Sequence, residues 1–488
     1  MSAARLLAGA ALLIAAPANA DTLREAMAKA YSTNPTLTAA RADLRATDEN
    51  VPIARAAGRP EGAVNGSYTE NFLNSPGVQN SFTSPERQVV GQINLTVPLL
   101  TFGAVRGAVR AAERRVEQGR YNLAGTEADL FTSVVGAYMD VIRDEAVVGL
   151  NRQNVSVLDA ALVSNTERFK AGDLNPTDVA QSRARLSFAN AQLQTALARL
   201  ISSRENYIRL VGNPPGVLEP PPPLPPLPAS VDEAVAIAIR DNPNLLAAQK
   251  GRDATAHDIQ VANASRMPRV NGVLGGNYYD YLNSLRDNPF SRTFQASSTA
   301  SVGVELRVPL YQGGRPAAQV RQAQARRSQA IEQVFEAERT VIAQTRSAFA
   351  VYQSSQEVIA SSEIGVSSNR ESLEGVRAEN NAGTRTILDV LNAEQELLNS
   401  EVTRVTAIRD AYVAGFALLA AMGRAEARFL GLDGGSLYDP VANYNRVRNR
   451  ISDHGADPEP QASATSTSGT PAQDAAVTAL PNLPTTPR

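Results

Sequence analysis

The chain carries one arrangement of residues twice. Asn34-Pro35 recurs as Asn242-Pro243 at an offset of 208, and the later motifs recur at an offset of 211. These later pairs are Val97-Pro98-Leu99 with Val308-Pro309-Leu310, Ala171-Gly172 with Ala382-Gly383, and Asp178-Val179 with Asp389-Val390. A register kept over so many residues indicates an internal tandem duplication. Each copy should therefore build the same unit.

Residues 1–20 predict a cleaved export signal. Arg5 supplies the positive start, residues 6–16 are apolar, and Ala18-Asn19-Ala20 is a small-residue cleavage site. The apolar stretch is too short for a membrane anchor and ends in Pro17. We therefore expect the mature chain to begin at Asp21.

The rest of the chain divides into five segments. Residues 21–219 and 229–430 hold the two copies, and residues 220–228, which read PPPPLPPLP, should form an extended strut between them. Residues 431–451 are expected to be a C-terminal packing segment. Residues 452–488 are rich in Pro, Ala, Ser and Thr and show no apolar period, which predicts a disordered tail.

Two long windows without proline show a heptad of apolar positions, which predicts coiled-coil packing. A helix over residues 102–169 would be about 100 Å long, and turns at Gly172 and Gly383 should reverse the chain into a long helical hairpin in each copy. The outgoing heptads are Val134, Val141, Val148, Val155, Leu162 and Phe169, and Thr345, Tyr352, Ile359, Val366, Leu373 and Asn380. The returning heptads are Val179, Leu186, Leu193, Leu200 and Tyr207, and Val390, Leu397, Ala411 and Leu418, with Arg404 interrupting the second.

Before each long helix the apolar period changes from seven to two. Residues 92–97 and 300–308 alternate between apolar and polar side chains, and partner strands are expected near residues 62–72 and 269–281. Each strand is about the 9–11 residues that a membrane-spanning strand requires. Four strands cannot close a barrel alone, so this interpretation requires several chains. The alternative is two ordinary soluble hairpins with a buried apolar face.

The composition argues against several classes of function. The chain has no cysteine, two histidines and a formal net charge of −2, so disulfides, thiolate metal sites and a nucleic-acid footprint are not expected. The sequence shows no nucleophile with a matching base and no metal-ligand spacing. We therefore expect no enzyme activity, no cofactor and no metal.

The stretch from Ala382 to Glu394, AGTRTILDVLNAE, resembles the TolC family of outer-membrane efflux and type I secretion channels. The resemblance implies a mainly α fold in which long coiled-coil hairpins form an α-barrel, with four strands per chain completing a twelve-stranded membrane β-barrel in a homotrimer. It also implies an outer-membrane location with a long periplasmic extension. The implied partners are outer-membrane lipid, a periplasmic adaptor protein, and an inner-membrane ABC or proton-driven transporter.

Asp178 and Asp389 occupy equivalent positions just after the two turns, and Arg385 stands four residues before Asp389. The resemblance implies that Asp389 lines the periplasmic mouth and that Arg385 helps to close it, with Asp178 of a neighbouring repeat as one partner. Asn392 stands where better-known members carry a further mouth acid, and Asn380 where they carry an aromatic gate. The alternative for both acids is helix capping.

The two turns match the tips that this family presents to its adaptor. The tip residues are Ala171, Gly172, Asp173 and Leu174 in the first copy, and Ala382, Gly383 and Thr384 in the second. Glycine chemistry at a helix end would explain the same residues. Two hypotheses for the whole chain remain at this point: a passive exit duct for protein secretion or drug efflux, and a soluble periplasmic coiled-coil adaptor or scaffold.

Overall fold

The computed structural model describes residues 21–72, 85–285, 294–432 and 437–477, so the predicted export signal lies outside the described residues. The first copy contains α1 (Leu23–Thr33), α2 (Pro35–Asp48), α3 (Asn50–Ala56), β1 (Glu61–Glu70), β2 (Arg87–Leu100), α4 (Ala104–Ala171) and α5 (Pro176–Val211). The second contains α6 (Val231–Asp241), α7 (Pro243–Ala264), β3 (Arg269–Asp280), β4 (Ala296–Arg307), α8 (Arg315–Asn381) and α9 (Ile387–Ala421). A short helix, α10 (Ala442–Val447), follows.

One proline changes the helices that precede the strands in the two copies. In the first copy a break at Glu49 separates α2 from α3, whereas α7 runs unbroken through the corresponding part of the second copy. Pro52 stands in the first turn of α3 and cannot donate the hydrogen bond that a continuous helix would need there. Gln260 occupies the equivalent position in α7, so that helix continues.

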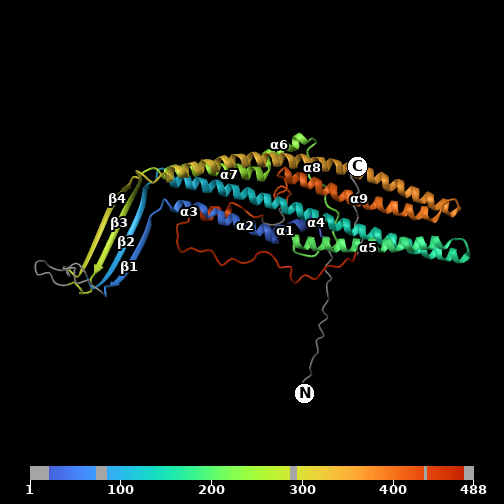
Figure 1. Ribbon diagram of the computed structural model, residues 1–488, viewed down its shortest axis with the longest axis horizontal. Helices are drawn as coiled ribbons and strands as arrows, with labels where there is room; N and C mark the ends of the chain where they lie inside the picture. Colours follow the sequence, from blue (N-terminus) through green and yellow to red (C-terminus); the bar gives the residue numbers. More distant parts are fainter. Residues whose placement is uncertain (1–20, 73–84, 286–293, 433–436, 478–488) are drawn as a thin grey trace, which may run out of the picture.

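The molecule is a long rod with a sheet at one end and two helical hairpins that turn at the other (Figure 1). The four strands form one antiparallel sheet in the order β1-β2-β3-β4. Strand β2 of the first copy pairs with β3 of the second, with Val89 opposite Asp280. The sheet therefore joins the two copies side by side, and β1 and β4 are its edges. The predicted long helical hairpins and antiparallel strands are confirmed.

The core lies midway along the rod, where α1, α4, α5 and α9 come together. Tyr138 and Tyr207 are almost fully buried there, and the Tyr138 hydroxyl donates to the backbone carbonyls of Asp21 and Glu219. In α4 the predicted heptad is fully buried at Val134, Val141 and Val148. The same heptad is partly exposed at its tip end, where Phe169 is 41 % exposed.

The predicted seam of α9 is wrong by one residue in the first half of the helix and confirmed in the second half, where Ala411 and Leu418 are buried. The buried heptad is Leu391, Leu398 and Val405, each one position after the predicted Val390, Leu397 and Arg404. Arg404 therefore does not interrupt the seam, because it lies beside it. Val390 and Leu397 are also apolar and directly precede Leu391 and Leu398, so the sequence period alone did not fix which of the two neighbouring positions is buried.

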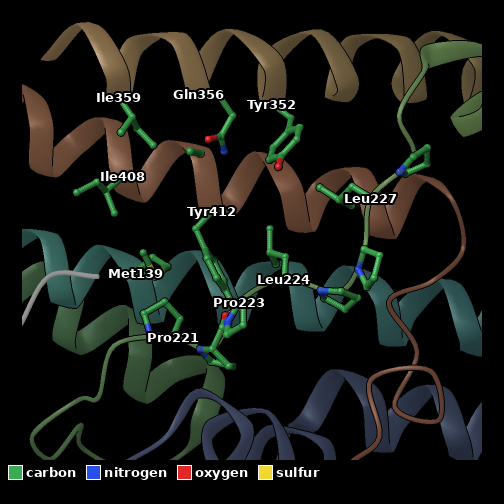
Figure 2. A pocket seen from close by; sticks show the side chains of 15 residues that line it. Met139, Pro221, Pro223, Leu224, Leu227, Tyr352, Gln356, Ile359, Ile408 and Tyr412 are labelled. Carbon is green, nitrogen blue, oxygen red and sulfur yellow. The ribbon is translucent and has the colours of Figure 1, made fainter. Parts of the chain in front are cut away.

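Residues 220–228, where the strut is expected, contain no helix or strand. The Tyr412 hydroxyl of α9 donates to the Pro222 carbonyl at 3.0 Å, and Leu224 packs where Gly415 leaves room on α9. Beside the strut lies a cavity of about 740 Å³ between α8, α9 and α4. Figure 2 shows Tyr412 reaching from α9 to the strut and Tyr352 and Gln356 pointing from α8 toward the same cavity.

The expectation of a disordered tail differs from the structure over residues 452–477. This segment has no helix or strand, as its composition suggested, but it lies against α4 and α5. Arg204 of α5 donates to the carbonyls of Asp474 and Ala476, and Arg152 of α4 donates to the carbonyl of Ala475. Val477 packs on the central core. Such contacts use single side chains and carbonyls and leave no period in the sequence.

Candidate functional site: the hairpin tips

The first tip is a tight helix-to-helix turn. Gly172 ends α4 with φ of +89°, a left-handed conformation that glycine adopts without strain, and the Asp173 N–H donates to the Arg168 carbonyl. Asn175 and Asp178 then form a capping box, in which the Asp178 carboxylate accepts from the Asn175 N–H at 3.2 Å. Pro176 opens α5, where its missing N–H costs nothing.

The second tip repeats this construction with different residues. Gly383 has φ of +79°, and the Thr384 N–H donates to the Glu379 carbonyl at 3.0 Å. Thr386 caps α9, and Asp389 accepts from the Thr386 hydroxyl at 2.7 Å and from its N–H at 3.1 Å. These two bonds, with the nearby charge of Arg385, hold the pKa of Asp389 below its usual value. Asp389 is therefore ionised at neutral pH.

The structure thus shows that Asp178 and Asp389 both cap helices. Capping uses one carboxylate oxygen, and both residues remain partly exposed in the single chain. A charged oxygen can therefore serve the helix and still contribute to the field at the mouth. The pore-lining role of the two acids stays a prediction.

Arg385 has a partner that the sequence spacing missed. Its Nε lies 2.7 Å from Glu379 Oε2, and the pKa of Arg385 is raised by this hydrogen-bonded pair. Arg385 precedes the cap of α9, so its spacing of four from Asp389 does not lie on one helix. The Asn380 side chain closes the same turn by donating to the Arg385 carbonyl at 2.8 Å. Within the single chain, the second tip is therefore tied to itself.

Asn392 also has a partner that the sequence analysis missed. The Arg185 Nη2 of α5 donates to Asn392 Oδ1 at 2.6 Å and joins the first hairpin to the second. Next to this bond, Leu158, Ala189 and Leu391 form a small buried cluster between the hairpins. The sequence shows a cation on α5 and an amide on α9. It does not show that the two side chains meet, because that depends on how the helices pack.

The predicted tip residues all lie at the ends of the hairpins. Ala171, Gly172 and Asp173 are exposed and Leu174 is partly buried, while Ala382, Gly383 and Thr384 are exposed. Among the described residues, no group of His, Cys, Asp or Glu has the arrangement of a metal site. Within the same residues, no helix combines the length and apolar character needed to cross a membrane.

Residues 26–213 and 235–424 each match the family described as outer membrane efflux protein. The chain belongs to the outer membrane efflux protein family. Two separate matches in one chain also agree with the tandem duplication. The helical hairpins and strands described above are the parts that these matches cover.

Three curated relatives match between 64 % and 92 % of this efflux-family chain. Outer membrane efflux protein BepC of Brucella suis is 31 % identical over 452 residues, which is 92 % of this chain and 95 % of BepC. Outer membrane protein TolC of Escherichia coli is 26 % identical over 397 residues, 78 % of each chain. Alkaline protease secretion protein AprF of Pseudomonas aeruginosa is 27 % identical over 318 residues, 64 % of each chain.

Solved structures show the same fold. A crystal structure of CusC matches with a TM-score of 0.71 and 18 % identity over 83 % of this chain and 92 % of CusC. The outer membrane protein VceC of Vibrio cholerae matches with a TM-score of 0.70 and 22 % identity over 82 % of this chain and 96 % of VceC. The prediction of an outer-membrane export channel is confirmed, and the alternative of a soluble adaptor is not supported. The family members matched here are channels rather than enzymes.

Proposed function

We propose that this chain is the exit duct of a tripartite export system, in which three copies enclose one passive conduit through the outer membrane. The observation that carries the proposal is a sheet with two free edges, β1 and β4, at the end of a long helical rod. A sheet edge exposes unpaired backbone groups, and only closure satisfies them in lipid. Four strands from each of three copies supply that closure.

The faces of the sheet support the same arrangement. Along β4, Val302, Val304 and Leu306 share one face and are 62–85 % exposed in the single chain, while Ser301 and Glu305 share the other. An apolar face of this extent suits lipid, and a polar face suits a water-filled lumen. The duct needs no catalytic group, because an inner-membrane ABC or proton-driven transporter supplies the energy.

The tips form the periplasmic mouth in this proposal. Three copies bring together six carboxylates from Asp178 and Asp389, with the amides of Asn380 and Asn392 nearby. A periplasmic adaptor docks on the exposed turns around Gly172 and Gly383. The relatives' names include both efflux and protease secretion, so the proposal extends to export without assigning a cargo.

The proposal is tested by the assembly of the purified chain and by its conductance. Extracted from the outer-membrane fraction in detergent, the protein should have the native mass of three chains and should form cation-preferring channels in planar bilayers. A soluble periplasmic monomer or dimer without conductance would show that the duct is wrong and would favour the adaptor.

Arg385→Ser should raise the conductance of a single channel. The substitution removes the pair with Glu379 that ties the second tip, and it removes a cation from the mouth. Lys170→Ser is a matched control, because Lys170 pairs with Glu167 in the exposed last turn of α4. Equal conductance in the two variants would contradict a gating role for Arg385.

A further inference from the structure

Near the tips, α5 and α9 can be compared position by position, because they are equivalent helices of the two copies. On α5, Gln181 and Arg185 are four residues apart and so lie on one face. The offset of 211 places Asn392 and Glu396 at the same positions on α9. Within one chain Arg185 donates to Asn392, but Gln181 and Glu396 have no side-chain hydrogen bond or ion pair among the described residues. Both of these side chains are exposed.

The contact between the two hairpins of one chain predicts the contact between hairpins of neighbouring chains. The first hairpin packs its Arg185 face against Asn392 of the second hairpin. In a ring of alternating hairpins, the second hairpin must pack in the same way against the first hairpin of the next copy. In this second contact, the position of Arg185 is taken by its counterpart in the other copy, Glu396, and the position of Asn392 is taken by its counterpart, Gln181. The two side chains left without partners are therefore the two that this second contact brings together.

We propose that Glu396 of one copy accepts a hydrogen bond from the Gln181 amide of the next copy, which makes a second kind of seam between neighbouring hairpins. This proposal rests on the homotrimeric duct proposed above. Three seams within chains are joined by Arg185 and Asn392, and three seams between chains are joined by Gln181 and Glu396. The chemistry fits, because a carboxylate accepts and an amide donates.

The two seams differ in strength. The within-chain seam is backed by the apolar cluster of Leu158, Ala189 and Leu391. The equivalent positions between chains are Asn369, Ser400 and Ala180, and Asn369 is already hydrogen-bonded to Ser400 inside its own hairpin. With less apolar surface to bury, the seam between chains separates first when the mouth opens. Each chain then moves as one unit during opening.

The alternation also sets the charge of the mouth. Asp178 and Asp389 form an acidic layer, Gln181 and Asn392 a neutral amide layer, and Arg185 and Glu396 a layer with equal numbers of cations and anions. Of these three layers, only the acidic layer carries a net charge and so favours cations. Removing Arg185 would leave three unbalanced Glu396 carboxylates and should increase cation preference.

The chain has no cysteine, so engineered thiols can be cross-linked selectively. In the trimer, the double variant Gln181→Cys with Glu396→Cys should give dimers and trimers on a denaturing gel after treatment with a short bis-maleimide. Arg185→Cys with Asn392→Cys should give a cross-link within single chains. The single variants Gln181→Cys and Glu396→Cys are the controls for thiols that meet their own symmetry copies.

The outcomes separate the two proposals. A trimer by native mass whose Gln181→Cys, Glu396→Cys variant links no chains together would overturn the seam and leave the duct intact. A chain that forms no trimer would overturn the duct itself. As a second measurement, Gln181→Glu should raise conductance severalfold by placing like charges across the seam, and adding Glu396→Gln should restore the wild-type value. Failure of that rescue in a folded trimer would also overturn the seam.

Discussion

Glu127 of α4 is a half-buried carboxylate in the centre of the rod. It accepts a hydrogen bond from the backbone N–H of Ala427, and burial, with Glu426 nearby, raises its pKa to about 7. The folded protein therefore holds this proton more tightly than the unfolded chain does. The contribution of Glu127 to stability is fully present below the ordinary glutamate pKa of 4.5 and is lost as the pH rises through the folded-state pKa of about 7.

Glu127→Gln should remove this pH dependence. The amide keeps an acceptor oxygen for Ala427 and carries no charge, so the variant should exceed the wild type at about pH 8 by on the order of 2 kcal/mol in unfolding free energy. At about pH 5 the two should nearly coincide. Thermal unfolding followed by circular dichroism at both pH values measures the difference. A constant difference at both pH values would contradict the assignment.

The residues of the mouth show how far sequence reasoning reached at this scale. It placed Asp178 and Asp389 correctly at the starts of the returning helices, because the turn glycines and caps are local signals. It missed the pairing of Arg385 with Glu379, because the chain is not helical between them. It also missed Arg185 with Asn392, because that bond joins helices from different copies. The pore-facing role of these residues stays a prediction.

At the scale of the elements, Arg204 links α4, α5 and the C-terminal segment. Its Nη2 lies 2.7 Å from Glu145 Oε1, and both side chains are nearly buried, at 12 % and 10 % exposure. Arg204→Met should leave the Glu145 carboxylate without its partner and destabilise the protein by about 3 kcal/mol. Asp474→Ala should change the unfolding free energy by less than about 0.5 kcal/mol, because the Asp474 side chain is 81 % exposed.

Chemical unfolding of the two variants provides the comparison. If Asp474→Ala lost as much stability as Arg204→Met, the exposed end of the network would be its important part and the argument from burial would be wrong.

The heptads show what the sequence could and could not predict at the scale of the elements. Their period identified both long hairpins, but the seam of α9 runs through Leu391, Leu398 and Val405. Val390 and Leu397 directly precede Leu391 and Leu398 and are also apolar, which made two adjacent seams compatible with the sequence.

At the scale of the whole molecule, the two faces of the sheet should respond in opposite ways to a charge. Val302→Arg places a cation on the apolar face of β4, which should cost about 2–4 kcal/mol near the middle of a bilayer and reduce the yield of trimer. Ser301→Arg, one residue away on the polar face, should assemble normally and lower cation preference. Trimer yield in outer-membrane extracts and reversal potentials measure both effects. Normal trimer yield from Val302→Arg would mean that this face does not meet lipid.

The tandem duplication and the change of apolar period made much of the architecture predictable from sequence. They predicted two long helical hairpins and a pair of strands before each of them, but they did not predict that β2 of the first copy pairs with β3 of the second. The C-terminal segment has no counterpart in the repeat and no period of its own, so nothing in the sequence indicated that residues 452–477 lie along α4 and α5.

The pairing of β2 with β3 also sets the order in which the chain can fold. Each helical hairpin depends on contacts between nearby residues and can form as soon as its own copy has emerged. The sheet cannot, because Val89 must wait for Asp280, and bringing such distant residues together is slow. The β1-β2 hairpin alone would be marginally stable in water. The helical hairpins therefore form first and the sheet forms last. This order shortens the time for which the apolar face and the free edges of the sheet are exposed to aggregation.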